Sequence, residues 1–111
     1  KNQLRRSQGS SKLNICDLVI DQVSHTVIRN GKQIALTRLE FELLATLAKE
    51  PGRVFTREAL LKEVWGYSLP ADTRLVNVHI QRLRAKVEMD VDNPKIVLTV
   101  RGIGYKAGTN V

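Results

Sequence analysis

The stretch that decides the fold spans residues 71–87 and reads ADTRLVNVHIQRLRAKV. Its apolar residues Val76, Ile80, Leu83 and Val87 recur at the spacing i, i+4, i+7 and i+11. This spacing aligns them along one side of an α-helix, as expected of a helix that packs one face against a core. The sequence therefore predicts an amphipathic helix here.

The opposite side of this helix carries only cationic and hydrogen-bonding groups. Ordinary solvated faces mix the two signs of charge, for example as Glu–Lys pairs, and this face does not. Either Asp72 or Thr73 can serve as the N-cap, because each side chain can accept from a free backbone N–H group of the first turn. Such a face suits the major groove of DNA, which admits one α-helix; a plain solvated face is the alternative. Its side chains are Arg74, Asn77, Gln81, Arg82, Arg84 and Lys86.

The composition predicts one small globular domain. The chain has 111 residues, of which 42% are hydrophobic, enough for one core but not for two. No apolar run approaches the roughly 18 residues that span a bilayer, and no signal-peptide pattern opens the chain. The single cysteine, Cys16, excludes an internal disulfide and a zinc knuckle, and we expect it as a small buried residue. These features favour a reducing cytoplasm and no membrane contact.

The positive charge of the chain is concentrated in two segments. Residues 1–12 carry four Lys or Arg and no acid, and residues 72–111 carry seven basic and four acidic side chains. Residues 13–36 and 37–71 are each balanced, with two and five of either sign. The net charge of +7 therefore lies in the leading tail and in the last third. A surplus confined to particular segments indicates an electrostatic footprint for a negative partner.

The first third of the chain reads as a tail followed by a small sheet. Residues 1–12 have the polar, Gly/Ser-rich composition of a flexible linker, although a frayed terminus would look the same. Residues 13–36 contain short strand-like runs, and Asn30-Gly31 is a strong signal for a type I′ hairpin turn. We expect an antiparallel sheet with one face on the core. His25 has no cluster of partner residues that would make it a metal ligand.

A capping box marks the start of a first helix. Thr37 is the expected N-cap and Glu40, three residues on, completes the box. Leu36 and Phe41 are spaced as a hydrophobic staple, and Pro51-Gly52 stops the helix after about residue 49. Its predicted inner side carries Phe41, Leu44, Leu47 and Ala48.

A second helix start repeats part of this pattern. Thr56 is the expected cap, Phe55 and Leu60 form a second staple, and Gly66 ends the helix. A loop then leads to the helix at 71–87. The predicted apolar positions of the second helix are Leu60, Leu61, Val64 and Trp65.

The chain closes with a predicted β-hairpin. Strand-like residues 96–101 and 105–107 are joined by Gly102-Ile103-Gly104, whose two glycines fit a tight turn. Arg101 at the tip suits a minor groove, which is narrow and negative over A·T-rich sequence. A Gly-x-Gly also occurs in phosphate-binding loops, but no Lys-Ser/Thr and helix follow, so we set nucleotide binding aside.

The order sheet, helix, helix, helix, hairpin predicts an α+β winged helix-turn-helix over residues 13–111. We expect no enzyme, because the acids are spread over helix surfaces and the two histidines lie far apart; no cofactor or metal is expected either. A winged helix that binds a protein partner is the alternative, and the salt dependence of binding separates it from a DNA-binding domain. RNA is disfavoured, because the aromatic residues that stack single-stranded bases are missing.

Nearly the whole chain, from residue 13 to residue 107, resembles the effector domain of OmpR/PhoB-type response regulators. Four motifs carry the resemblance: LTRLEFELL at 36–44, VWG at 64–66, RLVNVHIQRLRAK at 74–86 and TVRGIGY at 99–105. Residues 70–79 are similar to the MtrA branch of that family. The four motifs together are highly specific.

The resemblance implies a bacterial transcription factor that binds double-stranded DNA. A receiver domain, phosphorylated on aspartate by a sensor histidine kinase, would precede the linker. The full protein would dimerise through that receiver and bind tandem half-sites head to tail. In some members the loop between the second and third helices contacts RNA polymerase. The matching residues here are Gly66, Tyr67, Ser68 and Leu69.

The resemblance also implies roles for individual residues. Arg82 matches a base-reading arginine, Val78 lies beside it for a thymine methyl, and Arg101 matches the minor-groove arginine of the wing. Asn77 and Gln81 are amides suited to adenine. The positions matching phosphate contacts are Trp65, Arg74, His79, Arg84, Thr99 and Tyr105.

Some of these residues have a plainer interpretation. His79 is equally well explained as a packed, partly buried histidine, and Trp65 and Tyr105 as packing residues. Leu75 and Gln81 depart from members that carry polar or basic contacts at these positions, so the DNA sequence that this domain reads is expected to differ.

Overall fold

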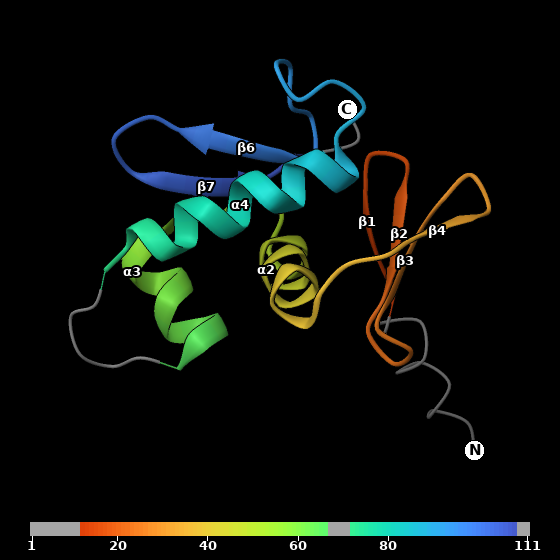
Figure 1. Ribbon diagram of the computed structural model, residues 1–111, viewed down its shortest axis with the longest axis horizontal. Coiled ribbons are helices and arrows are strands. Elements are labelled where there is room, and N and C mark those ends of the chain that lie inside the picture. Colours follow the sequence, from red (N-terminus) through yellow and green to blue (C-terminus); the bar gives the residue numbers. More distant parts are fainter. Residues whose placement is uncertain (1–11, 67–71, 109–111) are drawn as a thin grey trace.

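The computed structural model describes residues 12–66 and 72–108, and Figure 1 shows helices held between two antiparallel sheets. Lys12, which the sequence assigned to the tail, already begins the first strand. Helix α2 (Arg38–Lys49) is central: it packs against the first strand of the N-terminal sheet, the middle strand of the C-terminal sheet, and the helical segments at residues 61–65 and 74–87. Among the described residues, no helix is long and apolar enough to cross a membrane.

The N-terminal sheet contains four strands in the order β1-β2-β3-β4, all antiparallel. One face is buried, because Leu18 and Ile20 alternate with half-exposed neighbours along β2. At the turn between β3 and β4, Asn30 and Gly31 have φ of 50° and 80°, as a type I′ turn requires. The predicted sheet and hairpin are confirmed. The strands are β1 (Lys12–Ile15), β2 (Leu18–Asp21), β3 (Thr26–Arg29) and β4 (Lys32–Ile34).

The capping box at the start of α2 is present as predicted. The Thr37 hydroxyl accepts from the Glu40 backbone N–H at 3.3 Å, and the Glu40 carboxylate accepts from the Thr37 N–H at 2.9 Å. These two bonds satisfy backbone donors that the first turn of a helix leaves free. Leu36 and Phe41 both pack against the core. The helix ends at Lys49, where the sequence placed it.

The second helix begins as predicted but changes geometry midway. Thr56 caps α3 (Arg57–Leu60) by accepting from the Ala59 N–H at 3.0 Å. The helix then widens into a π-helical turn, η1 (Leu61–Trp65), which the 3.6-residue spacing of its apolar residues did not predict. Gly66 ends it with φ of 82°, a left-handed conformation that glycine adopts without strain.

The predicted helix at 71–87 is α4 (Arg74–Val87), and its apolar stripe is completely buried. Thr73 occupies the N-cap position, but its side chain makes no capping bond. Asp72 caps the helix instead, accepting from the Arg74 N–H at 2.9 Å.

The C-terminal hairpin is part of a larger sheet than predicted. Strands β6 (Val97–Val100) and β7 (Gly104–Ala107) pair as expected, and β5 (Phe55–Thr56) adds a third strand in the order β5-β7-β6. Gly104 belongs to β7 and not to the turn. A Cβ at Gly104 would lie 1.9 Å from the Phe55 carbonyl oxygen, so this glycine is required by the close approach of two backbones.

One hydrophobic core joins all these elements. Its members come from both sheets and from every helix, so the short N-terminal strands and the hairpin are stabilised by the same cluster. The residues with no measurable exposure are Leu18, Ile20, Leu43, Leu44, Leu47, Leu60, Val76, Ile80, Leu83, Val87 and Val97.

Candidate nucleic-acid interface

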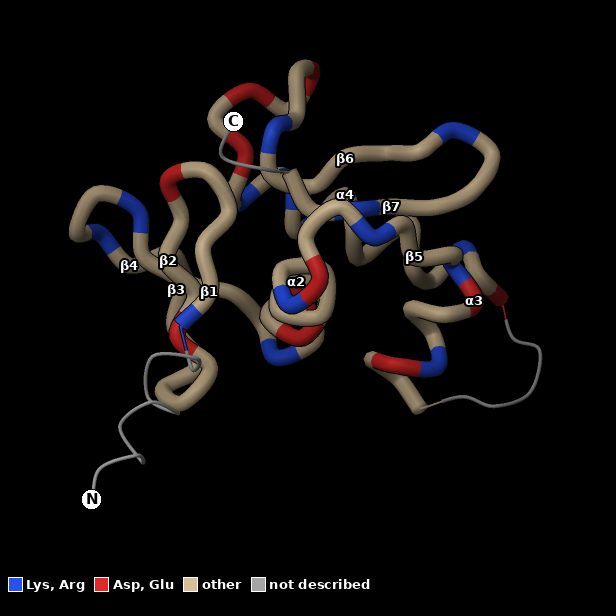
Figure 2. Tube along the Cα trace, turned by 180° about the vertical axis from the view of Figure 1, so that it is seen from behind, with Lys and Arg blue, Asp and Glu red and all other residues tan. Residues whose placement is uncertain are grey.

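The outer face of α4 is exposed and carries cations, and the one acid beside it, Asp72, precedes the helix. Arg74, Val78, Gln81 and Arg82 are exposed along it, and α4 itself contains no Asp or Glu. Val78 is 45% exposed, which is unusual for an apolar side chain on a helix whose buried stripe is complete. Figure 2 shows the acidic residues of the last third gathered mainly in the loop between α4 and β6. A negative partner can therefore approach this face without meeting a carboxylate from α4.

Arg74 begins this surface and is held by Asp72. The guanidinium Nε and Nη2 atoms donate to the two Asp72 carboxylate oxygens at 2.9 and 2.8 Å. These bonds, together with the Arg74 backbone N–H, lower the pKa of Asp72 to about 2 and raise that of Arg74. Because Arg74 is 84% exposed, water screens the ion pair, and a phosphate can compete for the guanidinium.

Asn77 is turned toward the protein and not toward solvent. Its amide oxygen accepts from the Tyr105 hydroxyl at 2.7 Å and from Arg57 Nε at 3.0 Å. Tyr105 is itself buried, so its ring packs in the core as the plainer sequence interpretation held. These bonds join α4 to β7 and to α3.

The expectation that Arg84 lies on the outer face is wrong. Its side chain is only 6% exposed, and its Nε and Nη2 atoms donate to the Val97 carbonyl at 3.1 and 2.8 Å. Nη2 also donates to the Thr99 hydroxyl at 2.7 Å. Arg84 follows Asn77 by seven positions, two helical turns, and so points to the same side, toward the hairpin.

Lys86 lies at the edge of the outer face and pairs with the core. Its Nζ donates to Glu40 at 2.6 Å, and the Glu40 side chain is only 2% exposed. Burial raises the pKa of Glu40, but the hydrogen bonds from Lys86 and from the Thr37 N–H outweigh it, so the pKa is lowered overall. This contact ties the capped end of α2 to the last turn of α4.

Trp65 and His79 lie together at the junction of η1 and α4. Their ring centroids are 5.1 Å apart in an edge-on contact, and His79 Nδ1 is 3.0 Å from the Leu75 carbonyl. Both rings are partly buried. Of the predicted polymerase-contact loop, Gly66 is described, and Tyr67, Ser68 and Leu69 lie outside the described residues.

The β6–β7 hairpin, which we call the wing, runs alongside α4, and its turn lies at the end where α4 begins (Figure 1). Arg101 and Ile103 are exposed in this turn, and Gly102 between them has φ of 76°. Thr99 is exposed on β6, whereas Lys106 on β7 is half-buried.

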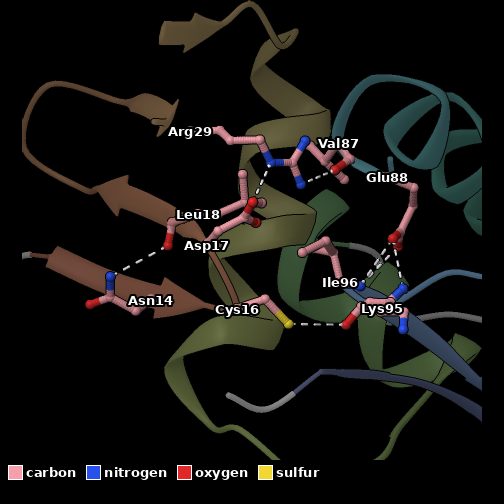
Figure 3. A network of polar contacts seen from close by, with 9 residues as sticks. All are labelled: Asn14, Cys16, Asp17, Leu18, Arg29, Val87, Glu88, Lys95 and Ile96. Carbon is pink, nitrogen blue, oxygen red and sulfur yellow. Dashed lines mark hydrogen bonds and ion pairs between the residues drawn. The ribbon is translucent and has the colours of Figure 1, made fainter. Parts of the chain in front are cut away.

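A second polar cluster, not predicted from the sequence, holds the other end of α4. Arg29 donates to the Val87 carbonyl at 2.6 Å and to Asp17 at 3.0 Å, which ties the N-terminal sheet to the end of the helix (Figure 3). The buried Glu88 carboxylate accepts from the backbone N–H groups of Lys95, Ile96 and Val97 at 2.7 to 3.1 Å. In the sequence Glu88 is indistinguishable from a surface acid, because its partners are backbone groups.

Cys16 is half-exposed, not buried as expected, and its Sγ is 3.5 Å from the Lys95 carbonyl. His25 stacks on the Phe41 ring at 4.7 Å. Within residues 12–66 and 72–108, no three His, Cys, Asp or Glu side chains are grouped so that they could hold a metal ion.

The three helices, the wing and the exposed cations of α4 together define a winged-helix effector domain. Residues 31–107 match the family described as "Transcriptional regulatory protein, C terminal", and the chain belongs to this family. It is a domain of the OmpR/PhoB type, as the sequence motifs predicted, and it is not an enzyme.

The most similar curated relatives include response regulators named MtrA. The chain is 62% identical over 108 residues to "DNA-binding response regulator MtrA" of Mycobacterium tuberculosis, which covers 96% of this chain and 47% of that protein. The protein of that name from Mycobacterium leprae is 61% identical, with 96% and 48% covered. The chain thus spans about half the length of these relatives.

Solved structures of related proteins share the fold. The response regulator DrrB of Thermotoga maritima, an OmpR/PhoB homolog, aligns with a TM-score of 0.81 at 34% identity, covering 96% of this chain and 49% of that one. The Klebsiella pneumoniae RstA DNA-binding domain, solved in complex with the RstA box, aligns with a TM-score of 0.80 at 34% identity, covering 87% and 96%. The predicted fold class, a winged helix with an N-terminal sheet, is confirmed.

Proposed function

We propose that this domain binds specific double-stranded DNA, with α4 in the major groove and the wing turn in a minor groove. One observation carries the proposal: the exposed face of α4 bears cations and no acid, and the wing that holds Arg101 lies beside it. A major groove admits one α-helix, and a narrow minor groove attracts an inserted arginine.

Base recognition is assigned to the exposed side chains in the middle of α4. Arg82 can donate two hydrogen bonds to guanine O6 and N7, and Val78 can contact a thymine methyl group. Gln81 exposes an amide that matches the adenine edge. Asn77 is half-buried, and its amide oxygen already accepts two hydrogen bonds. It is therefore less well placed than Gln81 to read adenine.

Phosphate contacts are assigned to residues at the rim of this surface. Arg74 and Thr99 are exposed, and His79 and Trp65 are partly exposed where α4 meets η1. Tyr105 and Arg84 are buried, so a direct phosphate contact from either requires the wing to shift. Phosphate contacts set the orientation of the protein on the duplex, whereas base contacts set the sequence.

We further propose that this domain is the output of a two-component response regulator. The relatives named MtrA are response regulators about twice as long as this chain, which leaves room for a receiver domain and, through it, a sensor histidine kinase. A contact with RNA polymerase through residues 66–69 belongs to the same proposal, as does a cytoplasmic location.

Binding measured at several salt concentrations tests the DNA proposal. Duplexes selected from random sequence should bind with an affinity that falls steeply with salt, by roughly 0.9 in log–log slope for each phosphate neutralised. An unselected duplex should bind more weakly, with a similar slope. If selection enriched no sequence and binding to duplexes did not depend on salt, the proposal would fail in favour of a protein-interaction domain.

A further inference from the structure

One set of hydrogen bonds connects the inner side of α4 to the wing. Asn77 is the centre of the first contact, because its Oδ1 accepts from Tyr105 on β7 and from Arg57 on α3. A carbonyl oxygen has two lone pairs, so both are occupied. Adenine reading by an amide requires one donor and one acceptor at the same time. The acceptor of Asn77 is not available for a base while these bonds last.

The second contact lies two helical turns further along α4. Arg84 donates to the Val97 carbonyl and to the Thr99 hydroxyl. Seven residues of α-helix span about 10 Å, so the wing is bound at two separated points along the same helix. Two contacts from separate turns of α4 restrain the position of the wing along the helix more than one contact can.

Both contacts meet at a single cross-strand pair of the wing. Thr99, which binds Arg84, is the register partner of Tyr105, which binds Asn77. The Arg84 guanidinium also lies 5.5 Å from the Tyr105 ring centroid. The turn that carries Arg101 begins directly after the next pair, Val100 and Gly104. A displacement of the Thr99–Tyr105 pair must therefore move Arg101.

We propose that Asn77, Arg84 and Tyr105 are positioning residues that hold Arg101 at the distance from α4 at which both grooves are occupied together. They act on DNA through the wing and not by touching bases or phosphates. This inference rests on the proposed function and changes the roles that the sequence resemblance implied for these three residues. It also explains why their polar atoms point into the protein.

The test uses Tyr105→Phe, which removes one hydroxyl and keeps the buried ring. Affinity is measured for two duplexes that share the α4 site and differ only in an A·T-rich or G·C-rich flank under the wing. Wild type should prefer the A·T-rich flank. Loss of the hydrogen bond should lower this preference roughly threefold to tenfold, the equivalent of one buried hydrogen bond. Arg101→Ala should abolish the preference, and Tyr105→Phe should have little further effect in that background.

A matched pair at residue 77 separates positioning from loss of fold. Asn77→Asp keeps an acceptor for both Tyr105 and Arg57 and should keep the flank preference, because its added charge weakens both duplexes alike. Asn77→Leu has no acceptor and should lose the preference. Gln81→Ala, an exposed amide one turn on, should leave the flank preference unchanged. Urea unfolding of each variant identifies any effect that is only loss of folded protein.

Two results would overturn the inference. If Tyr105→Phe weakened both duplexes equally, the hydroxyl would be a direct phosphate contact. If Asn77→Leu changed the preference at one base pair under α4 and left the flank preference intact, Asn77 would be a base reader. Wild-type protein that bound no duplex in a salt-dependent manner would instead remove the proposed function, and this inference with it.

Discussion

Two arginines on α4, only two positions apart, have opposite roles. Arg82 is exposed on the outer face, whereas Arg84 is buried and bonded to β6. Two residues turn an α-helix by about 200°, so neighbouring cations with the same chemistry point to opposite sides. Only the outward arginine is placed to read a base in the proposed complex.

Arg82→Ala should relax specificity at one base position and cost about 1–3 kcal/mol against the preferred duplex. The measurement compares affinities for the selected duplex and for its single-base variants. Arg74→Ala is the control, since a phosphate contact should weaken all these duplexes by a similar factor. Equal weakening of every duplex by Arg82→Ala would reassign Arg82 to phosphate.

Arg84→Ala should instead reduce stability. It leaves the Val97 carbonyl and the Thr99 hydroxyl without their donors, which costs about 1–3 kcal/mol in the free energy of unfolding. Urea unfolding measures the loss. Arg82→Ala on the outer face should change this free energy by less than about 0.5 kcal/mol. Comparable losses for the two variants would contradict the burial of Arg84.

At the scale of elements, a few specific contacts determine how neighbouring helices and strands meet. The capped end of α2 is bound to α4 through Glu40 and Lys86, and β5 meets β7 so closely that only glycine fits at residue 104. These contacts position α4 and the wing against the core, so they support the proposed DNA-binding surface without being part of it.

Stability should fall in acid partly because of Glu40. Its pKa is lowered in the folded protein from an ordinary value of 4.5, so its contribution is complete above that pH. The contribution is lost as the pH falls through the folded pKa, since the protonated carboxyl no longer pairs with Lys86. Glu40→Gln should therefore be less stable than wild type at neutral pH, and the difference should shrink in acid. A difference that stayed constant with pH would exclude the ion pair as its cause.

Gly104→Ala should separate β5 from β7. The added Cβ would lie 1.9 Å from the Phe55 carbonyl oxygen, so the backbones must move apart at a cost of about 1–3 kcal/mol. Thermal unfolding should detect the loss, and hydrogen exchange should show weaker protection in β7. Ile103→Ala in the exposed turn is the control and should leave both unchanged. Unaltered protection of β7 in Gly104→Ala would contradict the close approach.

At the scale of the whole molecule, the two parts of the proposed DNA-binding surface lie at the same end. The wing turn and the start of α4 lie together, whereas the β3–β4 turn lies at the other end of the molecule (Figure 1). If DNA binds at this end, we expect the position of each cation to affect binding more than the net charge of +7 does.

Two variants with the same change of net charge should show this difference. Arg74→Gln should lower the log–log slope of affinity against salt by about 0.9, the loss of one phosphate contact. Lys32→Gln, an exposed cation on β4, should leave the slope unchanged. Titrations of one duplex over a series of salt concentrations measure both. Equal changes would mean that only the overall charge matters.

The sequence by itself determined the elements of this domain and their order. Local signals were sufficient where a residue interacts with near neighbours, as Thr37 does with Glu40 and Asn30 with Gly31. The regular spacing of apolar residues was sufficient to predict the buried stripe of α4. The four motifs also identified the family. These features depend on contacts within a few residues or on spacing alone, which a sequence displays directly.

Only the tertiary structure decided which polar residues face the solvent. Arg84, Asn77 and Glu88 are ordinary surface residues by type, and they face inward because β6, β7 and the loop after α4 bring partners to them. Strand β5 and the need for glycine at residue 104 likewise follow from two distant backbones that meet. Such pairings join residues up to several tens of positions apart, and no local pattern encodes them, because their partners are backbone groups or side chains that only the folded core brings close.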